Sequence, residues 1–326
     1  MEYPCEIKTT SLTELFDKVY PPKTAIIENF LYNGTYLFVG APKVGKSFLM
    51  AQLAYHISLG TPLWGLKTNQ GRVLYLALED DEARIQHRMF QMYGVSDCDK
   101  CHFATKALQI NTGLEHQLEY FLFHYRDTKV IIIDTLQKIR NITNDNYSYA
   151  SDYEIVARLK AFADRFNICL LLVHHTRKQQ SDDSFDTISG TNGLLGAADG
   201  AFVLQKEKRT SSKAVLDIAG RDQQAQRLFL SFSENCIWNL DKRENNITIP
   251  PTDPILDKIG SFVNEEKPVW SGTATQLAEV LGIDKAPCAL TRYLNANISR
   301  LLEEYSIEYQ VSRTELKREI KLKKLL

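Results

Sequence analysis

The octapeptide GAPKVGKS at residues 40–47 restricts the possible folds of this chain more than any other feature. It fits the pattern G-x-x-x-x-G-K-S at every specified position. An apolar run over residues 35–39 predicts a strand before it, and a helix is predicted over residues 46–59. In this setting backbone N–H groups and the positive end of the helix dipole bind phosphate. A chance glycine turn is the alternative, but both flanking elements favour a phosphate-binding loop.

This loop predicts which residues contact a nucleotide. Lys46 is expected to reach the β- and γ-phosphates, and the Ser47 hydroxyl to ligate Mg²⁺. The predicted nucleotide-binding set comprises Gly40, Ala41, Pro42, Lys43, Val44, Gly45, Lys46, Ser47 and Phe48.

A second motif predicts the other magnesium ligand. Asp134 closes the apolar run over residues 130–133. A carboxylate at the carboxyl end of such a strand lies on the ligand side of an α/β sheet, where it can hold magnesium through water. A helix cap or turn residue is the alternative. Many P-loop ATPases place a glutamate directly after this aspartate to activate water, but here the position holds Thr135.

A general base must therefore come from elsewhere in the chain. Glu79 follows the predicted strand over residues 72–78, and its carboxylate could orient an attacking water. Asp80 is the competing candidate, and either residue could instead cap the helix that follows. We favour Glu79 because it is nearest the strand end.

Two histidines follow the buried strand predicted over residues 168–173. A polar residue at this strand end can hydrogen-bond a γ-phosphate, so His174 and His175 are candidate phosphate sensors. Two ordinary loop histidines are the alternative. The polar residues 179–189 show neither helical nor strand periodicity and predict a mobile loop, which could carry the state of the phosphate to a partner.

Basic residues gather around one predicted hairpin turn, at Lys206, Lys208, Arg209 and Lys213, and Arg221 follows the next strand. An arginine that stabilises charge on a γ-phosphate can raise the rate by orders of magnitude, and it can come from a neighbouring subunit. We predict that Arg221 has this role, with Arg209 and Lys213 as rivals. A solvated basic turn is the alternative.

The order of the predicted elements indicates the fold class. Strands and helices alternate as far as about residue 199, which predicts an α/β fold with a parallel sheet covered on both faces. Four closely spaced strands follow and predict an antiparallel extension. The predicted division is an N-terminal segment over 1–28, a nucleotide-binding domain over 29–245, a polar linker over 246–254 and a small domain over 255–326.

The small C-terminal domain has its own pattern. Three predicted helices followed by two short strands outline a winged helix-turn-helix, and a three-helix module without a ligand is the alternative. Residues 318–323 alternate polar and apolar side chains, which predicts an edge strand. Residues 313–326 hold six basic and two acidic side chains, so the predicted wing is positively charged.

Together these motifs resemble those of RecA-like P-loop ATPases, in particular the RepA-type hexameric helicases of plasmids and other mobile elements. The segments GAPKVGKS, YLALED, VIIIDT, LLVHHTRK and SGTNGLLGAADGAFVL occur in the order that this family shows, over about residues 29–240. The resemblance implies a RecA-like fold and a ring hexamer with ATP and Mg²⁺ bound between subunits. The implied partners are single-stranded DNA and a primase or replication initiator.

The resemblance also implies roles for individual residues. Glu79 would activate water, His174 or His175 would sense the γ-phosphate, and Arg221 would act from the next subunit. The polar loop after the histidines would face DNA in the ring channel. Its three aspartates at positions 182, 183 and 186 weaken that last interpretation.

The overall charge is compatible with a DNA partner. The chain has 39 basic and 40 acidic side chains, a net charge of −1. Affinity for nucleic acid depends on local neutralisation of phosphates, so this balance only limits where DNA could bind. No apolar run approaches the roughly 20 residues of a membrane helix, and no signal peptide pattern is present at the start. A cytoplasmic protein without a membrane partner is expected.

A cysteine motif, Cys98-Asp-Lys-Cys101-His102, matches the C-x-x-C-H pattern of haem attachment. That chemistry needs an exported chain, and a zinc site would need a second pair of ligands. A surface turn before a strand is the favoured interpretation.

Three functions fit the sequence. The first is a ring helicase driven by ATP, and the second is a RecA-like regulatory or recombination ATPase that binds DNA without unwinding it. The third is a small-molecule P-loop kinase, which would need an arginine-rich lid. Residues 179–189 contain no arginine, so the kinase is disfavoured.

Overall fold

The computed structural model describes residues 7–140, 149–176, 183–188, 192–208, 210–221, 224–245, 252–313 and 318–325. The chain forms two compact units. The larger is Thr24–Ile247, and the smaller combines Met1–Lys23 with Thr248–Leu326, so the N-terminal residues group with the C-terminal part of the chain. No described helix combines the length and apolar character that crossing a bilayer requires.

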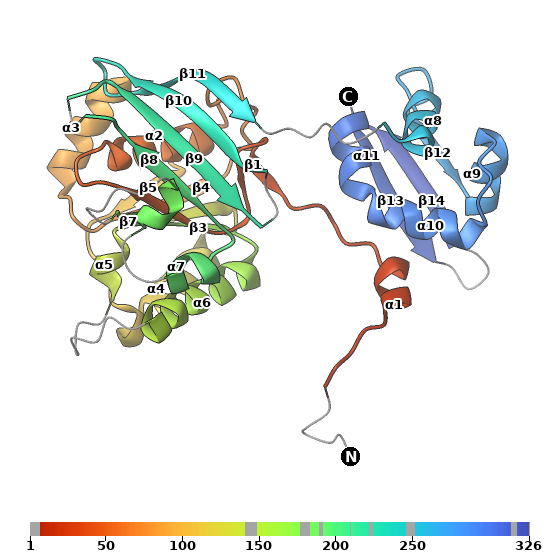
Figure 1. Cartoon of the computed structure of the whole chain (residues 1–326), viewed down its shortest axis with the longest axis horizontal. Coiled ribbons are helices and arrows are strands. Elements are labelled where there is room, and N and C mark those ends of the chain that lie inside the picture. Colours follow the sequence, from red (N-terminus) through yellow and green to blue (C-terminus); the bar gives the residue numbers. More distant parts are fainter. Residues whose placement is uncertain are drawn as a thin grey trace. The chain divides into compact units, whose positions relative to one another are not determined.

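A nine-stranded sheet, counted over the described residues, organises the larger unit (Figure 1). Its order is β11-β10-β9-β8-β3-β7-β6-β4-β5. The six strands from β8 to β5 are parallel, and β9, β10 and β11 extend the sheet in antiparallel fashion, which confirms the predicted α/β class. The strands are β3 (Gly34–Gly40), β4 (Arg72–Ala77), β5 (Cys101–Ala104), β6 (Thr128–Asp134), β7 (Cys169–His175), β8 (Gly200–Gln205), β9 (Lys213–Gly220), β10 (Gln226–Phe232) and β11 (Trp238–Asn245).

Helices cover both faces of the sheet, which explains why the central strands are apolar along their whole length. One hydrophobic core joins one face to α2 (Lys46–Leu59) and α3 (Glu82–Tyr93), and continues under the antiparallel strands. A second core lies on the other face, under four helices. These are α4 (Leu114–His124), α5 (Leu136–Ile139), α6 (Tyr149–Phe166) and α7 (Asn192–Ala197). The short elements are β1 (Ala25–Ile27), β2 (Leu31–Tyr32) and the 3₁₀ turns η1 (Ile110–Thr112) and η2 (Ser184–Thr187).

Two capping patterns in the sequence, Thr112-Gly-Leu-Glu115 and Ser151-Asp-Tyr-Glu154, predict helix starts that the structure does not have. Thr112 lies inside η1, where its hydroxyl donates to the carbonyl of Gln109, so it does not cap α4. Ser151 lies inside α6, which begins two residues earlier, at Tyr149. Threonine and serine hydroxyls satisfy local backbone groups in several conformations, so a capping pattern alone does not place a helix start.

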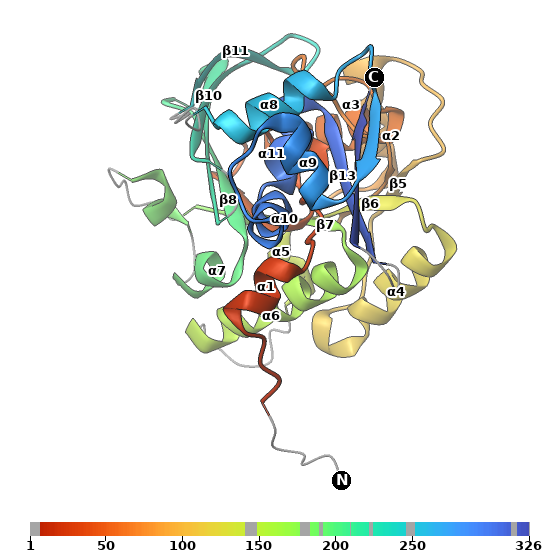
Figure 2. The ribbon, with the colours of Figure 1, turned by 90° about the vertical axis from the view of Figure 1, so that its right-hand side faces the viewer.

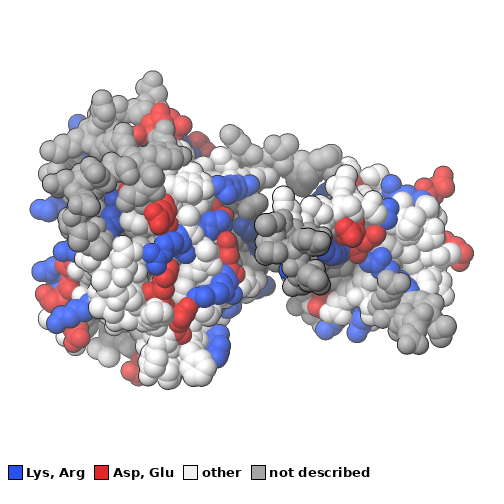
Figure 3. Space-filling model, turned by 90° about the horizontal axis from the view of Figure 1, so that it is seen from below, with Lys and Arg blue, Asp and Glu red and all other residues white. Residues whose placement is uncertain are grey.

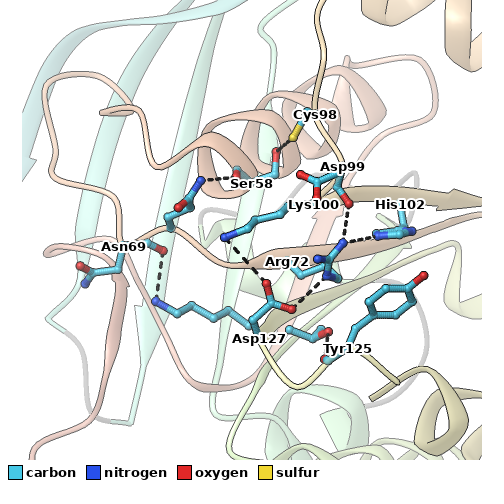
Figure 4. A network of polar contacts seen from close by, with 12 residues as sticks. Ser58, Asn69, Arg72, Cys98, Asp99, Lys100, His102, Tyr125 and Asp127 are labelled. Carbon is cyan, nitrogen blue, oxygen red and sulfur yellow. Dashed lines mark hydrogen bonds and ion pairs between the residues drawn. The ribbon is translucent and has the colours of Figure 1, made fainter. Parts of the chain in front are cut away.

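A polar network ties together the amino ends of β4, β5 and β6 (Figure 4). Arg72 Nε lies 2.9 Å from Asp127 Oδ1, its Nη1 contacts His102 Nε2 at 2.6 Å, and its guanidinium stacks 4.5 Å above the Tyr125 ring. The Asp99 carbonyl accepts a further bond from Arg72. The Arg72 guanidinium is therefore bonded or stacked by groups from β5 and from the loops before β5 and β6.

The cysteine motif lies beside this network. Cys98 Sγ donates to Ser58 Oγ at 3.2 Å, and Cys101 begins β5. Burial raises the pKa of the Cys101 thiol to about 12, so the thiol stays protonated at neutral pH. The described residues contain no group of three ligands for a metal, so the motif carries a structural contact here.

The smaller unit packs helices on one side of a three-stranded sheet of order β12-β14-β13. The sequence predicts three helices and two strands; the structure has an extra strand, β12, and Asn297 divides the last predicted helix in two. Its elements are α1 (Leu12–Asp17), α8 (Pro254–Phe262), β12 (Val269–Gly272), α9 (Ala274–Leu281), α10 (Pro287–Ala296), α11 (Ile298–Tyr305), β13 (Ile307–Arg313) and β14 (Arg318–Lys324).

The strand predicted at the sheet edge, β14, is instead the central strand. It pairs with β12 on one side and β13 on the other. Its alternation of exposed Lys321 and Lys323 with buried Ile320 and Leu322 shows that one face is covered. Alternation reports burial of a face and carries no information on whether both edges are paired, so the edge prediction is wrong.

Candidate functional site

The predicted phosphate loop connects β3 to α2 with the backbone that its glycine pattern requires. Gly45 is the N-cap of α2 with φ of +103°, a left-handed conformation that favours glycine. A Cβ atom there would lie only 2.8 Å from the Trp238 ring. The Trp238 indole N–H also donates to the Gly45 carbonyl at 3.2 Å, so the first residue of β11 holds this end of the loop in place.

Lys46 is buried at the start of α2 and folds back over the loop. Its Nζ donates to the carbonyls of Gly40 and Ala41 at 2.8 and 3.0 Å and lies 3.4 Å from His175 Nδ1. Burial lowers the Lys46 pKa to about 8, against the opposing effect of Asp134 and Glu79. The ammonium is thus held by neutral acceptors in a position from which it can reach an anion.

Ser47 and Asp134 meet as predicted for two ligands of one metal. Ser47 Oγ donates to Asp134 Oδ2 at 2.8 Å, across from α2 to the end of β6. Tyr75 of β4 donates to the same oxygen at 2.8 Å. Burial raises the Asp134 pKa, and hydrogen bonds from Ser47 and Tyr75 oppose the rise. One carboxylate and one hydroxyl fit Mg²⁺, which keeps several waters and prefers oxygen ligands.

The geometry separates the two candidates for the general base. Asp80 is held by two arginines: its carboxylate lies 2.7 Å from Arg88 Nη1 and 3.2 Å from Arg84 Nη1. Glu79 Oε1 instead accepts from the Thr135 hydroxyl at 3.4 Å, next to Asp134. Glu79 therefore lies beside Asp134, a predicted metal ligand, while Asp80 stabilises the start of α3.

The two histidines at the end of β7 differ in position. In the parallel pairing of β3 and β7, His174 lies opposite Val39 and His175 opposite Gly40. Successive side chains on a strand point to opposite faces, and His175 is the one whose Nδ1 lies 3.4 Å from Lys46 Nζ. Burial, together with the Lys46 charge, lowers the His175 pKa, which favours the neutral imidazole. Of the loop predicted over residues 179–189, residues 179–182 and 189 lie outside the described residues.

The basic candidates lie at opposite ends of β9. Lys213 begins this strand near the phosphate loop, whereas Arg221 follows its last residue, Gly220. In the sheet, Gly220 of β9 pairs with Gly200 of β8, and Gly200 pairs with Tyr36 of β3. Tyr36 lies four residues before Gly40, where the phosphate loop begins. At roughly 3.3 Å per residue, that is about 13 Å of strand from the loop.

Arg221 is anchored at that remote end. Its Nη2 donates to the Gly196 carbonyl at 2.6 Å, and its backbone N–H to the Asp199 carbonyl at 2.8 Å. Within one chain Arg221 is therefore apart from Lys46. The rival Arg209 lies outside the described residues.

Four aromatic side chains, Phe48, Tyr75, Phe232 and Trp238, lie near the loop or Asp134, and the sequence pointed only to Phe48. Phe48 was predicted to contact the nucleotide; its ring packs edge-on against Phe232 at 5.4 Å, with Arg88 at 5.3 Å. Lys206 lies over the Phe232 and Trp238 rings at 5.3 and 5.1 Å. Tyr75, in the predicted strand over residues 72–78, could have been suspected because a buried tyrosine hydroxyl needs a partner.

Comparisons with known proteins agree with this geometry. A family model described as an AAA domain matches residues 2–181. The ATPase domain of G40P is similar in structure, with a TM-score of 0.53 and 14% identity over 64% of this chain and 84% of that one. A DnaB-like replicative helicase, studied with its interactions with primase, has a TM-score of 0.52 and 15% identity over 62% and 57% of the two chains. At these identities the likeness shows the fold alone, a RecA-like ATPase fold. No curated protein sequence matches the chain.

Proposed function

Because the chain belongs to the AAA domain family, we propose that it hydrolyses ATP with Mg²⁺ as a ring of identical subunits that moves along DNA. The finer form of the proposal is a replicative helicase of the RepA type, from a plasmid or other mobile element. The observation that carries it is the meeting of Lys46, Ser47, Asp134 and Glu79 at the carboxyl edge of one parallel sheet.

The proposed chemistry uses this chain's own groups. Backbone N–H groups at the start of α2 and the Lys46 ammonium bind the phosphates. Ser47 and Asp134 hold Mg²⁺, which neutralises charge on the phosphate oxygens when bound. Glu79, oriented by the Thr135 hydroxyl, positions the attacking water as general base. Neutral His175 lies beside Lys46, where it can donate a hydrogen bond to the γ-phosphate and respond to its loss.

The position of Arg221 supports the proposed ring. A charge-stabilising arginine must reach the γ-phosphate, and within one chain Arg221 lies at the other edge of the sheet. A neighbouring copy can supply it, as arginines supplied in trans do in other P-loop ATPases. One similar structure is that of a DnaB-like replicative helicase and its interactions with primase, and a primase or initiator partner is proposed on that basis. A hexamer is proposed from the resemblance to the RepA-type helicases.

The proposed DNA partner agrees with the charge distribution only if contacts are local. Basic and acidic side chains are interspersed on the face of the larger unit drawn in Figure 3. A nucleic acid needs a locally basic surface, and an evenly mixed face does not provide one. Lys206 and Lys213, at the phosphate-loop end of β8 and β9, and the predicted polar loop are the proposed contacts of single-stranded DNA in the ring channel.

One experiment tests the function and separates the alternatives. ATP hydrolysis and oligomer size are measured with and without single-stranded DNA, and strand displacement is measured on a forked duplex. The helicase predicts a ring, stimulated hydrolysis and unwinding. Stimulated hydrolysis without unwinding would replace it with a RecA-like regulatory or recombination ATPase. Phosphoryl transfer to a metabolite without any effect of DNA would favour the kinase.

A further inference from the structure

The smaller unit has a donor-rich face that the N-terminal helix covers. Figures 1 and 2 show α1 beside α10. Arg292 Nε and Nη2 lie 2.7 and 3.3 Å from the two carboxylate oxygens of Asp17. Arg318 Nη2 donates to the Asp17 carbonyl at 2.7 Å, and Asn295 Nδ2 to the Phe16 carbonyl at 2.8 Å. Three donors thus converge on the acidic end of α1.

These donors are held in place by the fold. Arg292 and Asn295 lie on α10, the second helix of the α9–α10 pair, and Arg318 begins β14 of the terminal hairpin. The buried Tyr309 hydroxyl donates to Asn295 Oδ1 at 2.8 Å, which turns the amide nitrogen toward α1. In a winged helix-turn-helix, the second helix and the wing are the elements that meet nucleic acid. Arg292 and Asn295 of α10 and Arg318 of β14 all donate to Phe16 or Asp17, so these two elements share the face beside α1.

The contact between α1 and this face is weak enough for a ligand to displace it. Helix α1 has six residues, none of them buried. The Arg292 and Asp17 side chains are 39% and 42% exposed, and an ion pair this exposed contributes little stability. A ligand that offers more negative charge can therefore replace the carboxylate.

The contacts of α1 match those of a nucleic acid backbone. The paired arrangement of Arg292 with two carboxylate oxygens is the one that arginine makes with a phosphate. Lys285, in the turn before α10, is exposed and adds positive charge beside this helix. A backbone with repeated phosphates gains from several such contacts, whereas Asp17 offers one.

We propose that Arg292, Asn295 and Arg318 bind the phosphate backbone of double-stranded DNA, and that α1 competes for this face through Asp17. The outward residues Cys288, Ala289 and Ala296 of α10 are small, so a duplex can approach closely. They offer no ring for the base stacking on which single-strand binding relies. The proposal uses no residue of the ATP site and stands independently of the proposed ATPase function.

The test measures binding of a labelled duplex of about two helical turns to the full chain without nucleotide. Asp17→Asn is expected to raise the affinity about two- to fivefold by removing the competitor. Glu14→Gln is the matched control, because it removes the same charge from the same helix, and the Glu14 carboxylate accepts its hydrogen bonds from Ser11. Arg292→Gln and Arg318→Gln, each made in the Asp17→Asn background, should weaken binding and lower the salt slope by about one phosphate contact each.

Two results would overturn the proposal. Equal affinities of Asp17→Asn and Glu14→Gln would show that α1 does not compete with DNA through Asp17. Wild-type affinity in both arginine variants would show that this face does not bind the duplex. Equal gains for a single strand of the same length would overturn the choice of duplex. Repeating the series in Lys46→Ala keeps the result separate from the ATPase, because an inactive ATP site leaves every expected outcome unchanged.

Discussion

Charged side chains at the amino ends of the parallel strands, here called the amino edge, have different partners from those of the predicted ATP site at the carboxyl ends, here called the carboxyl edge. At the amino edge, Arg72 pairs with Asp127, and Lys160 lies 2.6 Å from Asp199. At the carboxyl edge, Lys46 bonds to two neutral carbonyls, and Asp134 accepts from two hydroxyls. Opposite charges in direct contact neutralise each other, whereas charges held by neutral groups keep a field that a ligand can use. The first edge stabilises the fold, and the second can bind phosphate and metal.

The pKa values show the same difference. Burial lowers the Lys46 pKa to about 8 and raises that of Asp134, so the carboxyl edge disfavours both charges. A phosphate beside Lys46 and a cation beside Asp134 relieve this cost. At the amino edge, the Arg72 guanidinium lowers the Asp127 pKa against the effect of burial.

The largest effect is expected from Lys46→Ala, which should abolish ATP binding because the loop loses its ammonium. Binding is measured by titration with a fluorescent ATP analogue. Lys129→Ala is the matched control: this half-buried lysine of the amino edge also has a pKa lowered by burial, and it donates to the Asn69 carbonyl. Retained ATP affinity in Lys46→Ala would refute the assignment of the loop.

Arg221→Ala should lower kcat by about 10³-fold or more if the guanidinium stabilises charge in a neighbouring site. Mixed with Lys46→Ala subunits, it should regain part of the activity, because each subunit supplies what the other lacks. Steady-state hydrolysis of mixed and unmixed proteins measures this. Lys213→Ala, at the other end of β9, tests the rival candidate in the same assay. If mixing Arg221→Ala with Lys46→Ala subunits restores no activity, Arg221 does not act in a neighbouring site.

Glu79→Gln should keep ATP binding and lower kcat by about 10²- to 10⁴-fold, the usual range for a lost general base. Asp80→Asn should instead keep hydrolysis and lower the melting temperature, since it leaves the half-buried Arg88 without its carboxylate. Single-turnover hydrolysis and thermal melting separate the two. Near-normal turnover of Glu79→Gln would return the role to Asp80.

ATP affinity should fall by about tenfold from pH 7 to pH 9, because Lys46 loses its proton near its lowered pKa of about 8. The unfolded chain binds this proton more tightly, so the Lys46 contribution to the free energy of unfolding rises over the same range. Lys46→Arg is the control, since a guanidinium stays protonated. A flat profile for the wild type would contradict the lowered pKa.

Arg72→Ala should have the smallest effect on activity, because the amino edge is distant from the nucleotide. It removes an ion pair, a bond to the Asp99 carbonyl and a cation–π contact. Loss of about 1–3 kcal/mol in the free energy of unfolding is expected. Urea denaturation and kcat are measured together, and a fall in kcat without loss of stability would break the contrast between the edges.

Much of the fold could be predicted because its patterns are local. The start of α2 at Lys46, the α/β alternation and the antiparallel extension follow from apolar runs and glycine spacing. The central position of β14 in its sheet could not be predicted, because it depends on pairing with β12, which lies far from β14 in the sequence, as well as with β13. The fourth helix of the C-terminal part, α11, was missed because Asn297 interrupts an otherwise continuous helical pattern.

The sequence by itself determined the phosphate loop, because its glycines and lysine act through their neighbours along the chain. It also narrowed the candidates for the general base to Glu79 and Asp80. Only the tertiary structure distinguishes their surroundings, by placing Arg84 and Arg88 on Asp80 and Thr135 on Glu79, which favours Glu79 as the proposed base. The reason is physical: a carboxylate's role depends on the charges within a few ångströms, and those come from elements that sequence spacing does not bring together.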